Sequence, residues 1–310
     1  MKKIDTHFHT KLSDWSRSNN DVLKESREKW INFISATEHD IINDELSLLA
    51  NVNWIANSLW VEISAVDNEV TWKSLHLTCY SDHFCDEIRS ILDNTREKRK
   101  LKIMKQVEKL ESHWFNINYK KFLRFYKNLD VNIDNVNNFH IEDYIFQNED
   151  NIDRLLLNLV GVKINKWDFI ARCLKKWWDL SYIWWQQIEL YEPSVSRIWK
   201  LVNNKKYFLS LAHPNFTFRN DKEWFLKFID YYKDKLNWIE INSQASEEWV
   251  KLIIDTSIKY WMILTFWSDS HHVWRDSKHW DLWDMNKFLT EDIIEENFED
   301  FLYELSKRKN

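Results

Sequence analysis

Histidines and carboxylates recur along this sequence, each close to a short apolar segment. Six of the eleven histidines lie at or just beyond such segments, and three carboxylates accompany them. Imidazole and carboxylate ligands together suit Zn²⁺, Mn²⁺ or Fe²⁺ rather than Ca²⁺. Nine such groups exceed the ligand number of one ion, so we expect them to bind two to three divalent metal ions. The predicted ligands are His7, His9, Asp14, His39, Glu62, His76, His213, Asp269 and His271.

The spacing of these residues indicates a shared site. His7 and His9 are two positions apart, and so are Asp269 and His271. Side chains at positions i and i+2 of a strand point the same way, so each pair can bind one ion. A single pair of this kind could equally be two polar side chains that face water. Because several such clusters each follow an expected strand, we interpret them as one metal centre in which Glu62 is the natural bridge.

The elements that must position these ligands are short β-rich segments separated by helical patterns. Strands that alternate with helices predict a parallel α/β sheet or barrel. In such folds the catalytic residues stand at the carboxyl ends of the strands. The expected strands are residues 3–6, 32–36, 60–64, 75–79, 207–212, 238–241 and 262–266. The expected helices include residues 20–29, 224–235, 246–259 and an amphipathic closing helix over 291–306.

The middle of the chain breaks this alternation. Residues 85–205 are rich in charge and show helical periodicity over 90–111 and 168–176. We expect residues 1–84 and 206–310 to form the metal-binding α/β unit. Residues 85–205 are expected to form a mainly helical insertion that acts as a lid or a second lobe.

Composition and charge argue against several classes of function. The formal net charge of -6 argues against a protein that coats nucleic acid by bulk electrostatics. Cys79, Cys85 and Cys173 form no CxxC pair and indicate reduced thiols. No apolar stretch approaches the roughly 18 residues of a membrane span, and no signal peptide is evident. We therefore expect a cytoplasmic protein with no membrane association and no stable protein partner.

The composition is abnormal in one respect, because the chain holds 20 tryptophans and a single glycine. Glycine normally supplies about 7% of residues, and few other residues adopt a positive φ cheaply. The tryptophans and the glycine together make up about that same 7% share. We hypothesise that most of these tryptophans are glycines in the living organism, where the UGA codon is read as glycine. The alternative is a protein that is truly rich in tryptophan.

The segments around the predicted ligands carry recognisable motifs. They are Asp-Thr-His-Phe-His-Thr at 5–10, Ser-Asp-Trp at 13–15, Thr-Glu-His-Asp at 37–40, Trp-Val-Glu-Ile-Ser at 60–64, Leu-His-Leu at 75–77, Ala-His-Pro at 212–214 and Trp-Ser-Asp-Ser-His at 267–271. Together these motifs resemble those of the PHP family, named for polymerase and histidinol phosphatase. The resemblance covers roughly residues 1–82 and 206–285. Three motifs have tryptophan where the family has glycine, at Trp15, Trp60 and Trp267, which supports the recoding hypothesis.

The resemblance implies a distorted (β/α)7 TIM-like barrel of the PHP type and three metal sites. All nine ligand positions of the family carry a competent ligand here. Within this pattern Glu62, His213 and Asp269 are the expected catalytic residues. The implied sites are His7, His9 and Asp269 for the first ion, with Glu62 bridging to the second; His76 and His213 for the second; and Asp14, His39 and His271 for the third.

Within the family, the length and the insertion resemble the nucleoside 3′,5′-bisphosphate phosphatase and 5′→3′ exoribonuclease group. That group has an arginine-rich helix after its fourth motif, which matches residues 95–100. Arg96 or Arg99 could grip a second phosphate through paired hydrogen bonds, whereas the alternative is a solvated helix face. Arg172 and His272 are further candidates for contact with substrate. We expect His83, His113 and His140 to be surface or structural residues.

The resemblance implies an enzyme that hydrolyses phosphate esters of nucleotides or oligonucleotide 5′ ends. Its substrate would be a phosphorylated small molecule or an RNA end, attacked by a metal-bridging hydroxide. One alternative is a histidinol-phosphate phosphatase, which shares the metal site but usually lacks so long a helical insertion. An alternative of another class is a nucleic-acid-binding or polymerase-associated module whose metals are structural.

Overall fold

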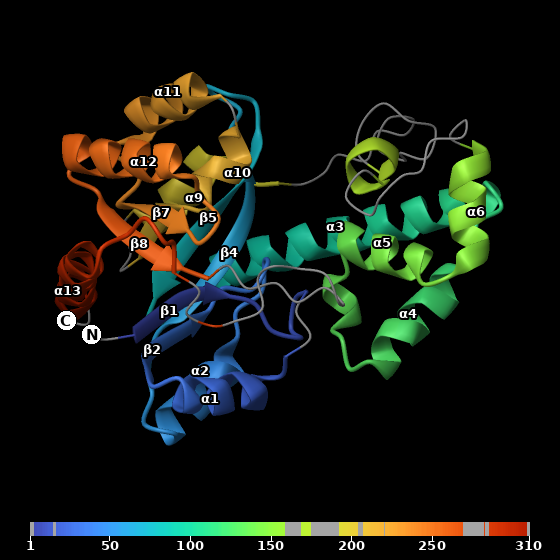
Figure 1. Cartoon of the computed structure of the whole chain (residues 1–310), viewed down its shortest axis with the longest axis horizontal. Coiled ribbons are helices and arrows are strands. Elements are labelled where there is room, and N and C mark those ends of the chain that lie inside the picture. The colour runs from blue at the N-terminus through green and yellow to red at the C-terminus, as the bar shows by residue number, and fades with distance from the viewer. Residues whose placement is uncertain are drawn as a thin grey trace.

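The structure is a computed structural model of the chain, shown in Figure 1. It describes residues 3–14, 17–158, 169–174, 192–203, 207–219, 221–268, 282 and 285–308. The first strand, β1 (Lys3–Phe8), and the last helix, α13 (Glu291–Arg308), pack in one apolar core and lie on the same side of the molecule (Figure 1).

The strands of the described residues form two sheets. The first is a parallel sheet in the order β1-β2-β3, and the second has the order β4-β5-β6-β7-β8. In the second sheet β5 is antiparallel to both neighbours, whereas β6, β7 and β8 are parallel. The strands are β1 Lys3–Phe8, β2 Ile31–Ala36, β3 Ala56–Asn57, β4 Leu59–Val66, β5 Ser74–Ser81, β6 Phe208–Leu211, β7 Trp238–Asn242 and β8 Ile263–Trp267.

The seven predicted strands are therefore confirmed, with ends that differ by no more than about two residues. The two-residue strand β3 was not expected, because a run of two residues carries no periodicity that a sequence pattern can detect. The predictions of β2, β4, β6 and β7 share a physical basis, because each of these strands is an apolar run whose residues are almost all buried.

The sheets approach each other in two places, where β1 lies beside β8 and β2 lies beside β4. A closed barrel is not seen among the described residues, so this part of the prediction is not confirmed. The edge of β2 that faces away from β1 pairs with β3, and the backbone hydrogen bonds to β4 come from the segment after β2. There the Asp40 amide donates to the Glu62 carbonyl at 2.8 Å, and the Glu62 amide donates to the Glu38 carbonyl at 3.0 Å.

Helices cover the sheets. The helices α1 and α2 pack beside β2 and β3, α9 packs on β6, and α12 and α13 lie against β7 and β8 (Figure 1). The predicted helices of this part are confirmed to within about three residues at their ends. Their bounds are α1 Asn19–Glu28, α2 Asp44–Val52, α9 Val195–Val202, α10 Pro214–Phe218, α11 Lys222–Tyr232, α12 Glu247–Tyr260 and α13 Glu291–Arg308.

Local sequence explains where these helices begin. Ser18 forms a capping box with Asp21 at the start of α1, and the side chain of Ser246 caps α12. The apolar faces of α9, α11 and α12 then pack against β4 to β8 in one large core. This core fixes the strand ends that carry the predicted ligands.

A second lobe extends from the sheets along one long helix. The first half of this helix, α3, packs in the main core through Ile88 and Leu92, and its second half packs in a separate core. Figure 1 shows α3 leading from the sheets to the other helices of the lobe. The elements are α3 Asp86–Ser112, α4 Tyr119–Asn128, the 3-10 turn η1 Ile133–Asn135, α5 Asn138–Phe146, α6 Glu149–Asn158 and the π-helical turn η2 Phe169–Leu174.

The helix predicted over residues 90–111 is confirmed within α3. The helix predicted over residues 168–176 is described only from Phe169 to Leu174, where the turn is of the π type. Among the described residues, no helix is both long enough and apolar enough to cross a membrane.

Candidate metal centre

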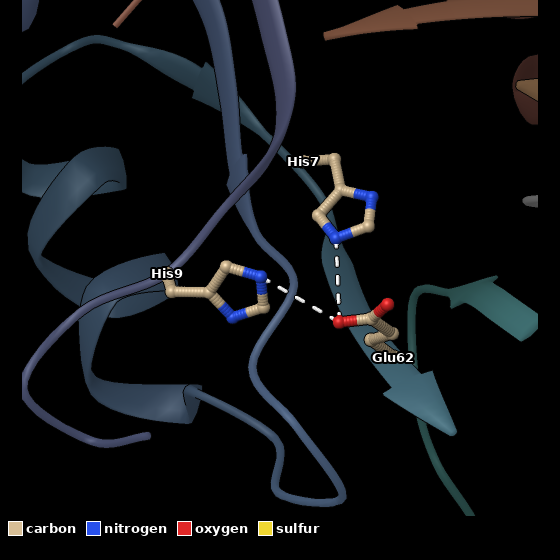
Figure 2. Close-up of side chains that lie close together, drawn as sticks. All are labelled: His7, His9 and Glu62. Carbon is tan, nitrogen blue, oxygen red and sulfur yellow. Dashed lines mark ion pairs between the residues drawn. The ribbon is translucent and has the colours of Figure 1, made fainter. Parts of the chain in front are cut away.

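The carboxylate of Glu62 lies buried at the centre of a group of histidines. One oxygen, Oε2, lies 3.4 Å from His7 Nε2 and 3.5 Å from His9 Nε2, and Figure 2 shows both rings directed toward it. The same oxygen lies 2.8 Å from His39 Nδ1. The other oxygen, Oε1, lies 2.7 Å from both His76 Nδ1 and His213 Nε2. Five imidazoles from distant parts of the chain therefore converge on one carboxylate.

The strands explain this convergence. His7 lies on β1 and His9 just beyond it, so the period of two directs both rings the same way. Glu62 lies on β4 and His76 on the adjacent strand β5, where His76 pairs with Ser64. His213 follows β6 and precedes the proline that opens α10, with φ of 28°. His39 follows β2, so these ligands lie on five strands or just beyond their ends.

Asp14 extends the cluster beyond His9 and His39. Its oxygens lie 3.6 Å from His9 Nδ1 and 3.3 Å from His39 Nε2. Three sets of groups place ligand atoms within 4.8 Å of one another, which is close enough to share an ion. These sets are His7, His9 and Glu62; His9, Asp14 and His39; and His39, Glu62 and His76.

The electrostatics of the metal-free cluster follow from burial and from its charges. Burial lowers the pKa of His7, but the carboxylates of Glu240 and Glu62 outweigh it and hold that pKa well above its ordinary value. At His39 burial is again outweighed, here by Glu62 and a neighbouring aspartate, and the pKa is raised. Burial would raise the pKa of Glu62, yet the histidines hold it well below its ordinary value. At His76 burial prevails and lowers the pKa.

A second layer of buried carboxylates supports the ligands. Glu240, on β7, has Oε2 3.2 Å from His7 Nδ1, and both side chains are fully buried. This contact leaves the other ring nitrogen of His7 facing Glu62, as in the carboxylate–histidine–metal arrangements of known metal sites. Sequence reasoning missed Glu240. The available signal was a carboxylate in the interior of an otherwise apolar strand.

Glu38 plays a similar supporting part for the loop between His9 and Asp14. It accepts a hydrogen bond from the Thr10 amide at 3.0 Å and others from the hydroxyls of Thr10 and Ser13. Glu38 therefore ties the segment after β2 to the segment after β1.

Two of the nine predicted ligands, Asp269 and His271, lie outside the described residues, as does the substrate candidate His272. The preceding residue, Ser268, is described and donates its hydroxyl to Asp5 Oδ2 at 2.7 Å. The structure thus brings together seven predicted ligands, and it places the end of β8 beside β1.

The predicted phosphate-binding arginines lie on α3 beside the cluster. Arg99 donates to Asn135 Oδ1 at 2.6 Å and pairs with the carboxylate of Asp40, the residue after His39. Arg96 donates to the backbone carbonyl of Asp40 at 2.9 Å. Both guanidinium groups therefore have protein partners next to the site. The side chain of the third candidate, Arg172, lies outside the described residues.

His140 is a buried residue of the helical lobe, in line with the structural role expected for it. Its Nδ1 accepts a hydrogen bond from the Asn137 amide at 3.1 Å and closes the capping box of α5. Burial lowers the pKa of His140 to about 4. The ring is therefore neutral at neutral pH.

Comparison with known proteins bears on the fold. No protein-family model and no curated protein matches the sequence. One similar solved structure comes from Bifidobacterium adolescentis, and its protein is described as a metal-dependent phosphoesterase by inference. The two sequences are 20% identical, the TM-score is 0.67, and the match covers 96% of each chain. An amidohydrolase structure from Chromobacterium violaceum, with bound sulfate and no metal, is 16% identical with a TM-score of 0.65, over 90% of this chain and 94% of that one. The chain shares the fold of these two proteins.

The donor set of the cluster fits divalent metal ions. It consists of imidazole nitrogens and carboxylate oxygens, which suit Zn²⁺, Mn²⁺ and Fe²⁺. The groups converge within ligand distance of a common space, as bound ions would require. Buried carboxylates orient the ring nitrogens from behind.

Proposed function

We propose that this protein is a metal-dependent phosphoesterase of the PHP type. The observation that carries the proposal is the buried carboxylate of Glu62 with five histidine nitrogens within 3.5 Å of it. A structural histidine is normally matched by one partner, whereas a carboxylate surrounded by imidazoles is typical of a bridging metal ligand. The fold shared with a protein named as a phosphoesterase supports the proposal.

Two to three divalent ions are proposed to bind here, with Mn²⁺ as the first choice for loading. His7, His9 and Glu62 would hold one ion, and Glu62, His76 and His213 would hold another. Asp14 and His39 would hold a third. Asp269 and His271 are proposed to complete the first and third sites, as the family pattern implies.

The bound ions would supply positive charge for the phosphate oxygens and would lower the pKa of a bound water from its bulk value to about 7. The protein's own residues set where this happens. His7 and His9 are fully buried, whereas the side chain of His76 is 33% exposed. The ester is therefore expected to approach from the side of His76 and His213, with Glu62 beneath it.

The substrate is proposed to be a nucleotide or an oligonucleotide 5′ end. Arg96 and Arg99 lie beside the cluster on α3, which connects this point with the helical lobe. The lobe, residues 85–205, is proposed to act as a lid or a wall for the substrate. The sulfate bound by the Chromobacterium protein is a tetrahedral anion like phosphate, which supports an anion site in this fold.

A panel of substrates tests the proposal. Protein loaded with Mn²⁺ is offered 3′,5′-bisphosphoadenosine, a 5′-phosphorylated oligoribonucleotide, histidinol phosphate and an N-acyl amino acid, and each product is quantified. Release of phosphate or mononucleotides from the first two supports the proposal. Turnover of histidinol phosphate alone favours that phosphatase, and turnover of the amide alone favours an amidohydrolase. Metal binding without any turnover favours a module with structural metals.

The matched control is a pair of Glu-to-Gln variants. Glu62→Gln keeps the size of the side chain but removes the charge at the centre of the cluster, so activity should be lost. Glu28→Gln makes the same change on an exposed side chain of α1, and its activity should equal that of the wild type.

A further inference from the structure

We infer that the asparagine segment, residues 132–137 of the helical lobe, positions the metal ligands Asp14 and His39. This inference rests on the proposed metal-dependent function. The segment joins α4 to α5 and includes η1. Its first contact is with the loop that leads to Asp14: the amide of Asn132 donates to the Lys11 carbonyl at 3.2 Å, and its side chain donates to the Leu12 carbonyl at 3.0 Å.

The next two contacts reach the ligands. The side-chain amide of Asn137 donates to Asp14 Oδ2 at 3.2 Å. The side-chain amide of Asn135, which is almost fully buried, donates to the backbone carbonyl of His39 at 2.8 Å. One segment therefore holds both residues of the Asp14–His39 pair, whose nearest atoms are 3.3 Å apart.

Arg99 completes the arrangement from α3. It donates to Asn135 Oδ1 at 2.6 Å and to Ser64 Oγ at 3.1 Å, and it pairs with the carboxylate of Asp40. Asp40 follows His39 directly and itself accepts from the Ser64 amide at 2.8 Å. We assign Arg99 a positioning role, which explains why its guanidinium faces the protein rather than open solvent.

This support is needed because of where the two ligands lie. His7 and Glu62 lie on strands, whose ladder hydrogen bonds fix the backbone. Asp14 lies in a turn beyond the end of β1, and the backbone around His39 is held to Glu62 by a single isolated bridge rather than by a strand. Partners of metal ligands commonly change metal affinity or activity by about 10- to 100-fold when they are lost. The helical lobe is thus part of the metal centre as well as a wall beside it.

The test is the substitution Asn137→Asp. Asparagine at this position also caps α5, and aspartate caps helices equally well. The variant therefore keeps the cap but replaces the donor to Asp14 with a second negative charge. Asn137→Ser keeps a capping oxygen and removes the donor without adding charge. Asn128→Asp, on an exposed residue of α4, is the matched control for the added charge.

Mn²⁺ binding is measured by titration calorimetry, with kcat and KM measured separately and thermal unfolding as the check on folding. We expect the weakest Mn²⁺ equivalent to bind about 10- to 100-fold less tightly in Asn137→Asp, with kcat lowered more than KM is raised. Asn137→Ser should show a smaller loss, and Asn128→Asp none. Unchanged Mn²⁺ binding in both Asn137 variants overturns the positioning role but leaves the proposed function standing. A wild-type protein that binds no Mn²⁺ overturns the proposed function as well.

A different observation concerns the backbone at tryptophan positions. Among the described residues other than glycine, nine have a positive φ, and five of these are tryptophans with φ between 55° and 69°. Their side chains are 75% to 95% exposed, so no packing holds them in this conformation. They are Trp30, Trp54, Trp72, Trp114 and Trp261.

Three of these tryptophans occupy the glycine position of a Schellman motif. In that motif the amide two residues past the helix bonds back to a carbonyl five residues earlier. This bond is 3.0 Å from Ile55 to Ala50, 3.1 Å from Phe115 to Leu110 and 2.9 Å from Met262 to Ser257. The residue before each donor is Trp54, Trp114 or Trp261, and it is the position where glycine is usual because it lacks a Cβ.

A buried tryptophan gives the same indication by packing. The rings of Trp60 and Tyr80 have centroids 3.3 Å apart, whereas aromatic pairs ordinarily lie about 4.5–7 Å apart. The position therefore suits a smaller residue. Trp60 also begins the motif that carries Glu62.

From these positions we propose that the organism inserts glycine at Trp30, Trp54, Trp60, Trp72, Trp114 and Trp261, by reading UGA as glycine. The test is peptide mass spectrometry of the protein purified from its own cells. Peptides that span residues 54 and 261 should carry the mass of glycine at these positions. Tryptophan at both positions overturns the proposal.

Discussion

Replacing the five exposed tryptophans of positive φ with glycine should stabilise the chain as written. A residue with a Cβ in the left-handed conformation costs roughly 1–2 kcal/mol. Glycine removes that cost, but it also raises the conformational entropy of the unfolded chain, which reduces the gain in stability by about 0.4–1 kcal/mol. The side chains are at least 75% exposed, so little burial is lost. The net gain is about 0.5–1 kcal/mol per site, or roughly 3–5 kcal/mol when the five contributions are summed.

For a chain of 310 residues, about 1 kcal/mol raises Tm by about 1.5 °C, so the variant should melt roughly 5–8 °C higher. Thermal unfolding is followed by circular dichroism, and urea denaturation gives the free energy of unfolding. The matched control replaces the same five tryptophans with alanine, which removes the indole but keeps the Cβ. Equal stability of the glycine and alanine variants would exclude backbone conformation as the cause, because exposure of the indole would then explain the change.

Three further outcomes follow from the site. Glu62→Ala should abolish Mn²⁺ binding and phosphate release, whereas Arg99→Ala should leave activity measurable; equal losses in a phosphate-release assay would contradict this order. Glu240→Ala should weaken Mn²⁺ binding by about 10- to 100-fold because the ring of His7 loses its carboxylate partner, and calorimetry that shows unchanged affinity would exclude that support. Because the pKa of His140 falls from 6.5 when unfolded to about 4 when folded, the unfolded state takes up a proton first and stability declines as pH falls from 6.5 to 4. In His140→Gln, which keeps the capping box, the unfolding free energy should fall by about 3 kcal/mol less over this pH range. Identical slopes of unfolding free energy against pH in both proteins would show that His140 is not the source of the decline.

Much of the fold was predictable because its strands are apolar throughout and end in polar residues. Strands such as Ile31–Ala36 and Trp238–Asn242 are buried along nearly their whole length, so their pattern survives in the sequence. The way the sheets meet was not predictable. It depends on backbone hydrogen bonds between Glu62 and the segment after β2, and backbone bonds leave no trace in residue type.

Within the site, the clustering of the ligands followed from their residue types and their places after strands. The supporting residues were hidden for a different reason. Glu240 and Asn137 act through partners more than a hundred residues away in the chain, and a single carboxylate or amide has many possible roles. The role of Arg99 was likewise ambiguous, because a charged residue on a helix can face a substrate, the solvent or, as here, a buried aspartate.

The central claim is that the cluster around Glu62 is a catalytic metal centre for phosphate esters. The most direct measurement is phosphate release from 3′,5′-bisphosphoadenosine by protein stripped with a chelator and then titrated with Mn²⁺, with bound metal quantified at each point. We expect no release from the stripped protein and activity that rises together with the first two to three equivalents of bound Mn²⁺. Full activity in the stripped protein, or two to three equivalents bound without any hydrolysis, would contradict the account.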